Sequence, residues 1–587
     1  MPIHTEIMPS FYQDSVVLMR IASQIRTRPG VREAAAFMGT PSNHALLEQI
    51  GLATAESRGA RPDDLILTVD AESAAAAGEA LAAAKELLVQ RRQASEKAAE
   101  LRPRTLESAL RMLPSANLVA ISVPGAYAKF EAMKAIKRGL HVFLFSDNLP
   151  LRDEIELKAE AVRRGVLCMG PDCGTAYLNG TGLGFTNVVP RGRIGCVAAA
   201  GTGLQAVVSR IAALGEGISH GIGVGGRDLS AEVGGTMTLF ALQALAADPS
   251  TEAIVIISKP SHAAVLPRLE AAIAKIRKPV VACVLGAKAP AESAAVWVDT
   301  LDAAADAVVA VLAKRIPARQ PFSNPSAIRA RLTRLHAGGP IAREVLGLFT
   351  GGTLAHEAHL LIESLLGHDI SQQILDLGDD QYTVGRPHPM IDPETRTGMI
   401  LKAGQEKAGV LLVDLVLGRG SHPNPAAPLA AAVRQACKAA EAAGRRLIAV
   451  GSVVGTAGDP QDLAGQVAQL EEAGIELLPS NAEAARFAAL LVKPELAETL
   501  ARFIHESFVT QPAFFANCVR EECGLRGVPM STLKIFTEPL RVINIGVEGF
   551  AEDLKAAGVE VIQLDWRPPT GGDARLVSLL AILQDED

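Results

Sequence analysis

Short runs of apolar residues alternate along most of the chain with longer, alanine-rich stretches whose apolar positions recur every three to four residues. The first pattern is typical of buried strands and the second of helices packed against a sheet. Strand–helix–strand alternation at this spacing predicts parallel strands joined by right-handed crossovers. We therefore expect a multidomain α/β protein.

The pattern also divides the chain into segments. The first segment mixes short strands with helices and predicts a small α+β, ferredoxin-like domain, and three α/β units follow it. A basic stretch flanked by proline and glycine predicts a linker between the last two units. The C-terminal strand–helix–strand is too small to bury itself, so we expect it to dock on the body or on another subunit. The expected boundaries are 1–100, 101–191, 192–318, 319–342 (linker), 343–490 and 491–587 (a helical connector and a small βαβ tail for subunit docking).

In two places an apolar strand runs into small residues and then into a helix. A strand over 194–199 leads to the turn at 200–203, with a helix from about Leu204, and a strand over 345–349 leads to the turn at 350–353. The unpaired amides and the positive dipole end of a helix start favour an anion. We expect the two turns to face one phosphate or carboxylate, although plain structural turns would give the same pattern. The expected phosphate-binding residues are Gly201, Thr202, Gly203, Gly351, Gly352 and Thr353.

Composition narrows the class of protein. The formal net charge of −7 argues against a nucleic-acid partner. The seven cysteines form no CxxC pair and no Cys/His cluster, so we expect reduced thiols and no metal site. The N-terminus has no secretion signal, and no apolar run approaches about 18 residues. We therefore expect a cytoplasmic protein that binds no membrane.

Polar loops at strand ends supply the other candidate residues, because parallel sheets bind ligands at the carboxyl ends of their strands. Arginine and lysine suit an anionic substrate, and histidine and aspartate suit proton transfer. A surface ion pair or a solvated, helix-capping loop is the alternative for these groups. The expected substrate-binding residues are Gly225, Gly226, Arg227, Lys259, Arg386 and Arg419, and the expected catalytic residues are His388, Asp392, Arg396 and His422.

Several motifs resemble a known enzyme family. The segments GPDCGTAYLN (170–179), GRIGCVAAAGTGLQAVVSRI (192–211) and KPVVACVLGAKAP (278–290) resemble the alpha subunit of succinyl-CoA synthetase. The segments GLFTGGTLAHEAHLLI (347–362) and ILDLGDDQYT (374–383) are similar to the ligase domain of its beta subunit. The fused arrangement resembles the FdrA branch of the acyl-CoA synthetase superfamily.

This resemblance assigns a type to each α/β unit. It implies a Rossmann-like, CoA-binding-type domain over 101–191, an alpha-type ligase domain over 192–318 and a beta-type ligase domain over 343–490. It also implies flavodoxin-like folds for the two ligase domains. The tail at 542–573 resembles the opening segment of the DUF1116-type proteins that accompany FdrA, so a DUF1116-type partner subunit and a homo- or hetero-oligomer are expected.

The chain departs from succinyl-CoA synthetase at the residues that carry its chemistry. The region expected to hold the phosphorylated histidine, 292–301, contains no histidine, and 257–261 lacks the glutamate of the family's GEIGG loop. No glycine loop for CoA precedes residue 118, and no ATP-grasp domain is visible. CoA and a nucleotide are therefore doubtful, and inorganic phosphate is expected as a substrate with no certain cofactor.

FdrA-type proteins are implicated in an oxamate carbamoyltransferase of purine (allantoin) breakdown, which converts oxalurate and phosphate to oxamate and carbamoyl phosphate. The resemblance implies this transferase activity here, because direct attack by phosphate needs no phosphohistidine. Two alternatives stay open. One is an NDP-forming acyl-CoA synthetase similar to succinate–CoA ligase, and the other is a non-catalytic scaffold or sensor derived from it.

Overall fold

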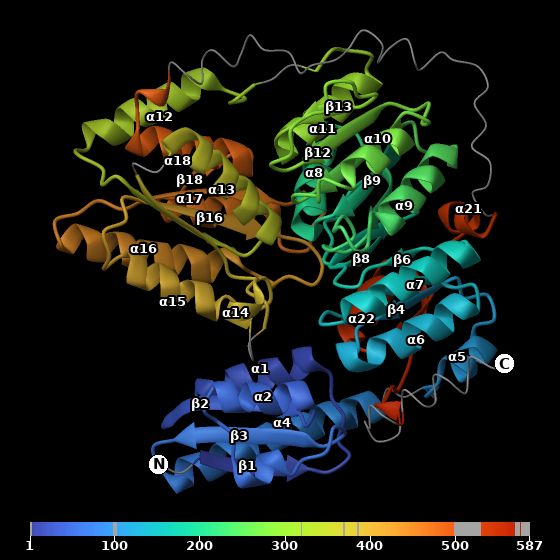
Figure 1. The fold of residues 1–587 in the computed structure, drawn as a ribbon. Helices are drawn as coiled ribbons and strands as arrows, with labels where there is room; N and C mark the ends of the chain where they lie inside the picture. The colour runs from blue at the N-terminus through green and yellow to red at the C-terminus, as the bar shows by residue number, and fades with distance from the viewer. Residues whose placement is uncertain are drawn as a thin grey trace. The chain divides into compact units, whose positions relative to one another are not determined.

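A computed structural model of the chain describes residues 3–97, 102–317, 320–367, 370–383, 387–497 and 530–569, together with Leu576. The chain divides into two compact units. The first unit comprises Met1–Pro150, Thr383–Pro387 and Arg541–Asp587, and the second comprises Leu151–Tyr382 and His388–Leu540. Figure 1 labels many of their elements.

The first unit opens with a small α+β domain. Its three antiparallel strands lie in the order β1-β3-β2, with β1 unforeseen from the sequence. Helix α1 begins after Asp14, whose carboxylate accepts the Val17 amide at 3.0 Å, and the α1 and α4 side chains pack with the sheet in one core. The elements are β1 (Ile3–Met8), α1 (Ser15–Arg26), β2 (Val31–Met38), α2 (Pro41–Gln49), α3 (Ala55–Arg58), β3 (Leu65–Ala71) and α4 (Ala74–Lys97).

A parallel sheet in the same unit joins residues 118–144 to the C-terminal tail. Four of its strands lie in the order β20-β19-β4-β5, and Figure 1 shows the red α22 close to the cyan β4. Val542 of β19 pairs with Leu118 of β4, and Ile545 pairs with Ile121. The elements are α5 (Leu106–Met112), β4 (Leu118–Ile121), α6 (Gly125–Lys137), β5 (His141–Leu144), β19 (Arg541–Ile545), α22 (Glu548–Ala556) and β20 (Glu560–Gln563).

The strand order decides where the tail lies. Of the two sites expected for it, the body or another subunit, the tail takes the first, because it docks on the chain's own body as an integral part of a sheet. Counted from β19, the order is 2-1-3-4, which is that of a doubly wound sheet whose first strand–helix–strand comes from the C-terminus. A strand–glycine turn–helix unit, missing ahead of residue 118, is therefore supplied by residues 541–556.

The second unit contains a mixed seven-stranded sheet in the order β13-β12-β11-β9-β10-β7-β8, in which β7 runs antiparallel to its two neighbours, β10 and β8. The unit begins at Leu151, inside the segment expected to be one Rossmann-like domain. The elements are α7 (Leu151–Arg164), β6 (Cys168–Met169), β7 (Thr175–Leu178), β8 (Thr181–Gly184), β9 (Arg191–Ala199), α8 (Gly201–Ala213), β10 (Ile218–Gly223), α9 (Thr236–Ala247), β11 (Ala253–Ser258), α10 (Leu266–Ile273), β12 (Val280–Val284), β13 (Val296–Val298) and α11 (Leu301–Leu312).

A parallel five-stranded sheet in the order β15-β14-β16-β17-β18 completes this unit. The expected linker contains a helix, α12, which begins after Asn324, whose side chain accepts the Ala327 amide. The elements are α12 (Pro325–Ala337), β14 (Glu344–Phe349), α13 (Gly352–Leu366), β15 (Ser371–Asp376), α14 (Asp380–Thr383), α15 (Glu394–Ala403), β16 (Val410–Val416), α16 (Ala426–Ala442), β17 (Ile448–Val454), α17 (Leu463–Glu472), β18 (Glu476–Leu478), α18 (Asn481–Val492) and α21 (Met530–Thr537).

One hydrophobic core joins the half of this unit that holds the seven-stranded sheet to the half that holds the five-stranded sheet. Side chains of α8 and α11 from the first half and of α13 and α18 from the second belong to the same buried cluster. Glu357 of α13 adds a polar tie, because its carboxylate accepts the Leu301 amide at 2.7 Å and the Asn481 side-chain amide at 2.7 Å. The starts of α11 and α18 are therefore fixed against α13.

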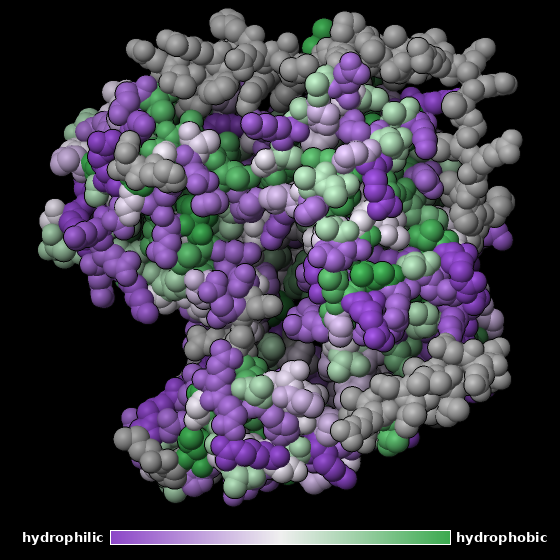
Figure 2. Space-filling model, in the orientation of Figure 1, coloured by the Kyte–Doolittle hydropathy of each residue, from purple (hydrophilic) through white to green (hydrophobic). Residues whose placement is uncertain are grey.

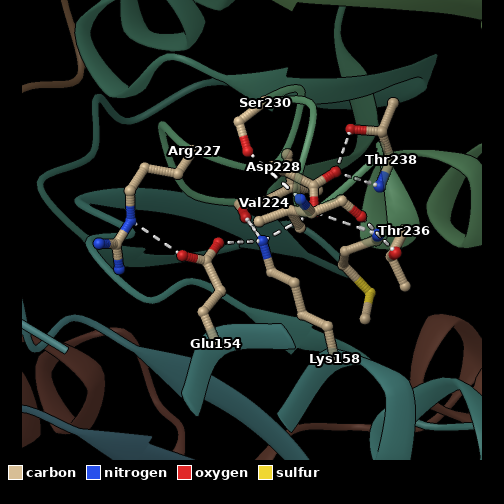
Figure 3. Close-up of polar contacts among 10 residues, drawn as sticks. Glu154, Lys158, Val224, Arg227, Asp228, Ser230, Thr236 and Thr238 are labelled. Atoms are coloured by element: carbon tan, nitrogen blue, oxygen red, sulfur yellow. Dashed lines mark hydrogen bonds and ion pairs between the residues drawn. The ribbon is translucent and has the colours of Figure 1, made fainter. Parts of the chain in front are cut away.

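A buried ion cluster ties α7 to the loop after β10 (Figure 3). The Lys158 ammonium is fully buried and donates to Glu154 at 2.7 Å, to Asp228 at 2.7 Å and to the Val224 carbonyl at 2.8 Å. Burial lowers the pKa of Lys158, but the two carboxylates outweigh that effect and raise it. Arg227 pairs with Glu154 at 2.9 Å, so two cations balance two carboxylates.

On the face drawn in Figure 2, hydrophilic side chains predominate and apolar patches are interspersed among them. Exposed large apolar side chains are scattered over several elements, among them Met112, Ile155 and Leu214. None of the helices in the described ranges combines the length and apolarity that a membrane span requires.

We predict that a chain ending at Thr537 loses much of the stability of its first unit. Val542, Ile543 and Ile545 are fully buried, and burying each contributes about 1.5–3 kcal/mol. The Trp566 indole, which donates to Glu131 at 3.0 Å, is lost as well. Differential scanning calorimetry should show a lower transition than in the full chain. An unchanged thermogram and solubility would contradict the placement of the tail.

We also predict that Lys158→Met destabilises the second unit by about 3–5 kcal/mol, because it leaves two buried carboxylates without their cation. Chemical denaturation followed by circular dichroism measures this change. The matched control is Lys275→Met at an exposed lysine, which should cost less than about 0.5 kcal/mol. Equal midpoints for the two variants would show that the cluster does not hold α7.

Candidate functional site

The two glycine turns lie in contact with each other. Helix α8 begins at Gly201 and α13 at Gly352, so the small residues form the first helical turns, and α8 begins three residues earlier than expected. The Thr353 amide donates to the Thr202 hydroxyl at 3.3 Å. Neither N-cap residue offers a side-chain cap, because Ala200 and Gly351 have none to give. Two helix starts without side-chain caps therefore meet.

The glycines at these starts have different surroundings. A Cβ on Gly203 would lie 2.9 Å from Thr353 Cγ2, so Gly203 permits the two helices to approach. A Cβ on Gly201 would have the Thr175 hydroxyl at 3.5 Å as its nearest neighbour, which is ordinary contact. Gly203 is thus needed for packing, whereas Gly201 tolerates a side chain sterically.

Asp414, in the second half of β16, holds the turn before α13. Its carboxylate accepts the Thr350 amide at 2.8 Å and the Gly351 amide at 2.7 Å, and it is fully buried. Arg396 donates to the same carboxylate at 3.1 Å and is itself buried. Arg396, expected to be catalytic, therefore lies behind the turn as a partner of Asp414.

Lys259 and Asp376 lie beside the first turn of α13. A Cβ on Gly352 would have Lys259 Nζ at 3.1 Å and would collide with the Asp376 carboxylate. Asp376 closes β15, and its Oδ1 accepts the Gly378 amide at 2.9 Å. Burial raises the pKa of Asp376, and the Gly378 amide and Lys259 oppose that shift. The sequence offered Lys259 as a substrate-binding residue, whereas Asp376 was missed.

His388 lies next to this pair as a neutral imidazole. Its Nδ1 accepts the Met390 amide at 3.2 Å, and its Nε2 lies closest to the position that a Cβ on Gly378 would take. Burial lowers the pKa of His388 to about 4. Because Nδ1 is an acceptor, the proton of the neutral ring is on Nε2. The ring also contacts Phe185, with centroids 6.2 Å apart.

The other expected residues of the second half lie in the loops around His388. The His422 amide donates to the Met390 carbonyl at 2.8 Å, so the two loops touch. Asp392 accepts the Glu394 amide at 3.0 Å, which is a capping contact at the start of α15. The Arg419 amide donates to the Thr186 carbonyl at 2.8 Å. Arg386 lies outside the described residues.

Gly225, Gly226 and Arg227 belong to a different part of the unit. A Cβ on Gly225 would collide with the Pro171 carbonyl oxygen, and φ at Gly225 is +83°. Arg227 pairs with Glu154 in the ion cluster of α7. Their described contacts connect these residues to α7 and the 170–172 loop, and none connects them to the helix starts.

We predict that Asp414→Ala destabilises the second unit by about 3–5 kcal/mol, because it leaves Arg396 buried without a counter-ion. Adding Arg396→Met should restore part of that loss, since the unpaired charge is removed as well. Thermal denaturation of the single and double variants measures both effects. Glu406→Ala, at an exposed glutamate, is the control. Additive losses in the double variant would contradict the pairing.

Two segments match known domain families. Residues 1–103 match the domain described as "AllF, heavy metal-associated domain", and residues 348–491 match the CoA-ligase domain. Residues 1–103 contain no cysteine. Among the described residues, no three His, Cys, Asp or Glu side chains are grouped to bind a metal ion. The amino-terminal residues therefore do not fit a thiolate site for a heavy metal.

Sequence similarity to known proteins covers most of the chain. The uncharacterized protein YahF of Escherichia coli (strain K12) is 37% identical over 503 residues, which are 82% of this chain and 97% of YahF. The alpha subunit of ADP-forming succinate–CoA ligase from Methanothermobacter thermautotrophicus is 30% identical over 177 residues, 30% of this chain and 59% of that subunit. YahG of E. coli is 47% identical over 51 residues, 9% of this chain and 11% of YahG.

A solved structure of ATP citrate lyase from Methanothrix soehngenii, in complex with citrate and coenzyme A, aligns with 78% of this chain and 86% of its own, at 13% identity and a TM-score of 0.30. The mixed α/β fold with parallel sheets and the small amino-terminal domain agree with the fold expected from the sequence. The chain belongs to the family of YahF, with an AllF-type amino-terminal domain and a CoA-ligase domain of the acyl-CoA synthetase-like superfamily.

Proposed function

We propose that this chain is an acyl-transferring enzyme of the CoA-ligase superfamily that holds a phosphate group at the first turns of α8 and α13. The observation that carries the proposal is the hydrogen bond from the Thr353 amide to the Thr202 hydroxyl, which places two helix starts side by side. Backbone amides and helix dipoles at both starts favour the same anion. Lys259, beside Gly352, adds a positive charge.

The residues around the turns suit transfer of an acyl group to or from phosphate. The amides of Gly201, Thr202 and Gly352 hold the phosphate oxygens, and Lys259 balances their charge. The Nε2–H of His388 donates to an oxygen of the phosphate or of the reacting carbonyl, because the ring is neutral. This role differs from that of a base, which the sequence also allowed.

The first candidate reaction forms an acyl-CoA. The CoA-ligase match and the succinate–CoA ligase relative support it. The sheet of the first unit supports it further, because a doubly wound sheet binds its ligand where the strand order reverses, here between β19 and β4. The turn after β19, which begins at Gly546, would hold the nucleotide end of CoA. CoA looked doubtful from the sequence because this turn comes last in the chain.

The second candidate is carbamoyl transfer from a ureido acid such as oxalurate. The observation that favours it is the absence of histidine from residues 292–301, where β13 and the start of α11 lie. A phosphate oxygen would attack the ureido carbonyl carbon, and the carbon–nitrogen bond would break. The leaving nitrogen would take the phosphate proton, giving oxamate and carbamoyl phosphate. A DUF1116-type partner subunit belongs to this candidate.

Two partial reactions separate the candidates without a nucleotide. Acetyl or succinyl phosphate with CoA should give a thioester, detected at 232 nm, if the first candidate holds. Oxalurate with phosphate should give carbamoyl phosphate, detected by coupling to ornithine carbamoyltransferase, if the second holds. Phosphate binding without either product, with and without the partner, would identify a scaffold or sensor.

We predict that Gly201→Val weakens the binding of inorganic phosphate at least about tenfold, because the side chain covers the α8 amides while fitting its surroundings. Isothermal titration calorimetry measures the affinity, and circular dichroism verifies the fold. The matched control is Gly398→Val in α15, where a Cβ has no neighbour within 4 Å. Wild-type affinity in the Gly201 variant would refute the site.

A further inference from the structure

A carboxylate stands at the place where the proposed phosphate would lie. Asp376 ends β15, which runs parallel to β14, the strand that leads into α13. Its Oδ1 accepts the Gly378 amide, and Oδ2 points at Gly352, since a Cβ there would collide with it. None of the described residues donates a hydrogen bond to Oδ2. An anion held by the first turn of α13 must therefore lie against this oxygen.

The charges around Asp376 do not cancel the repulsion between its carboxylate and a bound anion. Lys259, from the loop after β11, is the cation beside Gly352. The carboxylate of Asp414 in β16 is already bound by backbone amides of the turn before α13 and by Arg396. Asp379 lies in the same loop as Asp376. Burial lowers the pKa of His388 to about 4, and burial and Lys259 lower the pKa of His356. One lysine thus faces both Asp376 and any bound anion.

Anions differ in how they tolerate a carboxylate neighbour. Hydrogen phosphate carries a P–O–H group at neutral pH and can donate its proton to a carboxylate oxygen. Sulfate has the same shape and the same charge as the phosphate dianion but carries no proton. An ionised carboxylate therefore repels a neighbouring sulfate, unless the carboxylate first takes up a proton.

We propose that Asp376 makes this site selective for oxyanions that carry a proton, so that it accepts hydrogen phosphate and rejects sulfate. The proposal rests on the proposed function, since it requires a phosphate group at the starts of α8 and α13. Asp376 determines specificity here because its ionised carboxylate accepts a hydrogen bond from the P–O–H group of the ligand. The Asp376→Asn variant replaces the ionised acceptor with a neutral amide of the same size, which can donate to sulfate.

The test is isothermal titration calorimetry of the full chain with inorganic phosphate and with sulfate between pH 7.5 and pH 8.5, where inorganic phosphate is mainly the dianion. Wild type should bind phosphate at least about tenfold more tightly than sulfate at pH 8. That ratio should rise with pH, by up to about tenfold per unit, because sulfate binding takes up a proton and phosphate binding does not. Asp376→Asn should bring the two affinities within about threefold and remove the pH dependence.

The matched control is Asp379→Asn, which removes an equal charge from the same loop and should behave as wild type. Equal affinity of wild type for the two anions, or a ratio that does not change with pH, overturns the proposal and leaves the phosphate site standing. No binding of either anion overturns the proposal together with the proposed function. The wild-type pH series decides the question even if Asp376→Asn fails to fold.

Discussion

The close approach of α8 and α13 is the constraint on which the rest of the second unit depends. A helix start is a weak anion site by itself, and two starts in contact would repel each other unless something holds them together. Here the holding force is apolar, because both helices bury side chains in the core shared with α11 and α18. Gly203 then lets the helices close to van der Waals distance, and the contact of the Thr353 amide with Thr202 follows.

Two carboxylates near the site, those of Asp414 and Asp376, have different roles, and the difference follows from their hydrogen-bond partners. Asp414 satisfies two backbone amides and one buried guanidinium, so it is a structural group that fixes the turn. Asp376 has one amide partner and a lysine nearby, so it can respond to a ligand. Both lie toward the carboxyl ends of the two parallel strands that flank β14, and distinguishing them requires the contacts that only the fold supplies.

The sequence predicted what depends on local pattern. The strands before both glycine turns, the helices after them and the α/β class were all readable from apolar periodicity. The α12 helix carried a readable signal, Asn324 followed by Pro325, that the basic composition concealed. Asp376 and the partner of β4 were not readable, because the first needs the position of Gly352 and the second needs pairing across more than 400 residues.

The C-terminal origin of β19 has a consequence for how the protein is made. Strand β4 leaves the ribosome more than 400 residues before β19, its neighbour in the sheet. At about 5–20 residues per second, the gap lasts tens of seconds. Throughout that interval, the edge of β4 that will later pair with β19 stays unpaired in the nascent chain, and an unpaired apolar edge promotes aggregation. Cells that produce this protein should therefore depend on chaperones that shield growing chains until translation terminates.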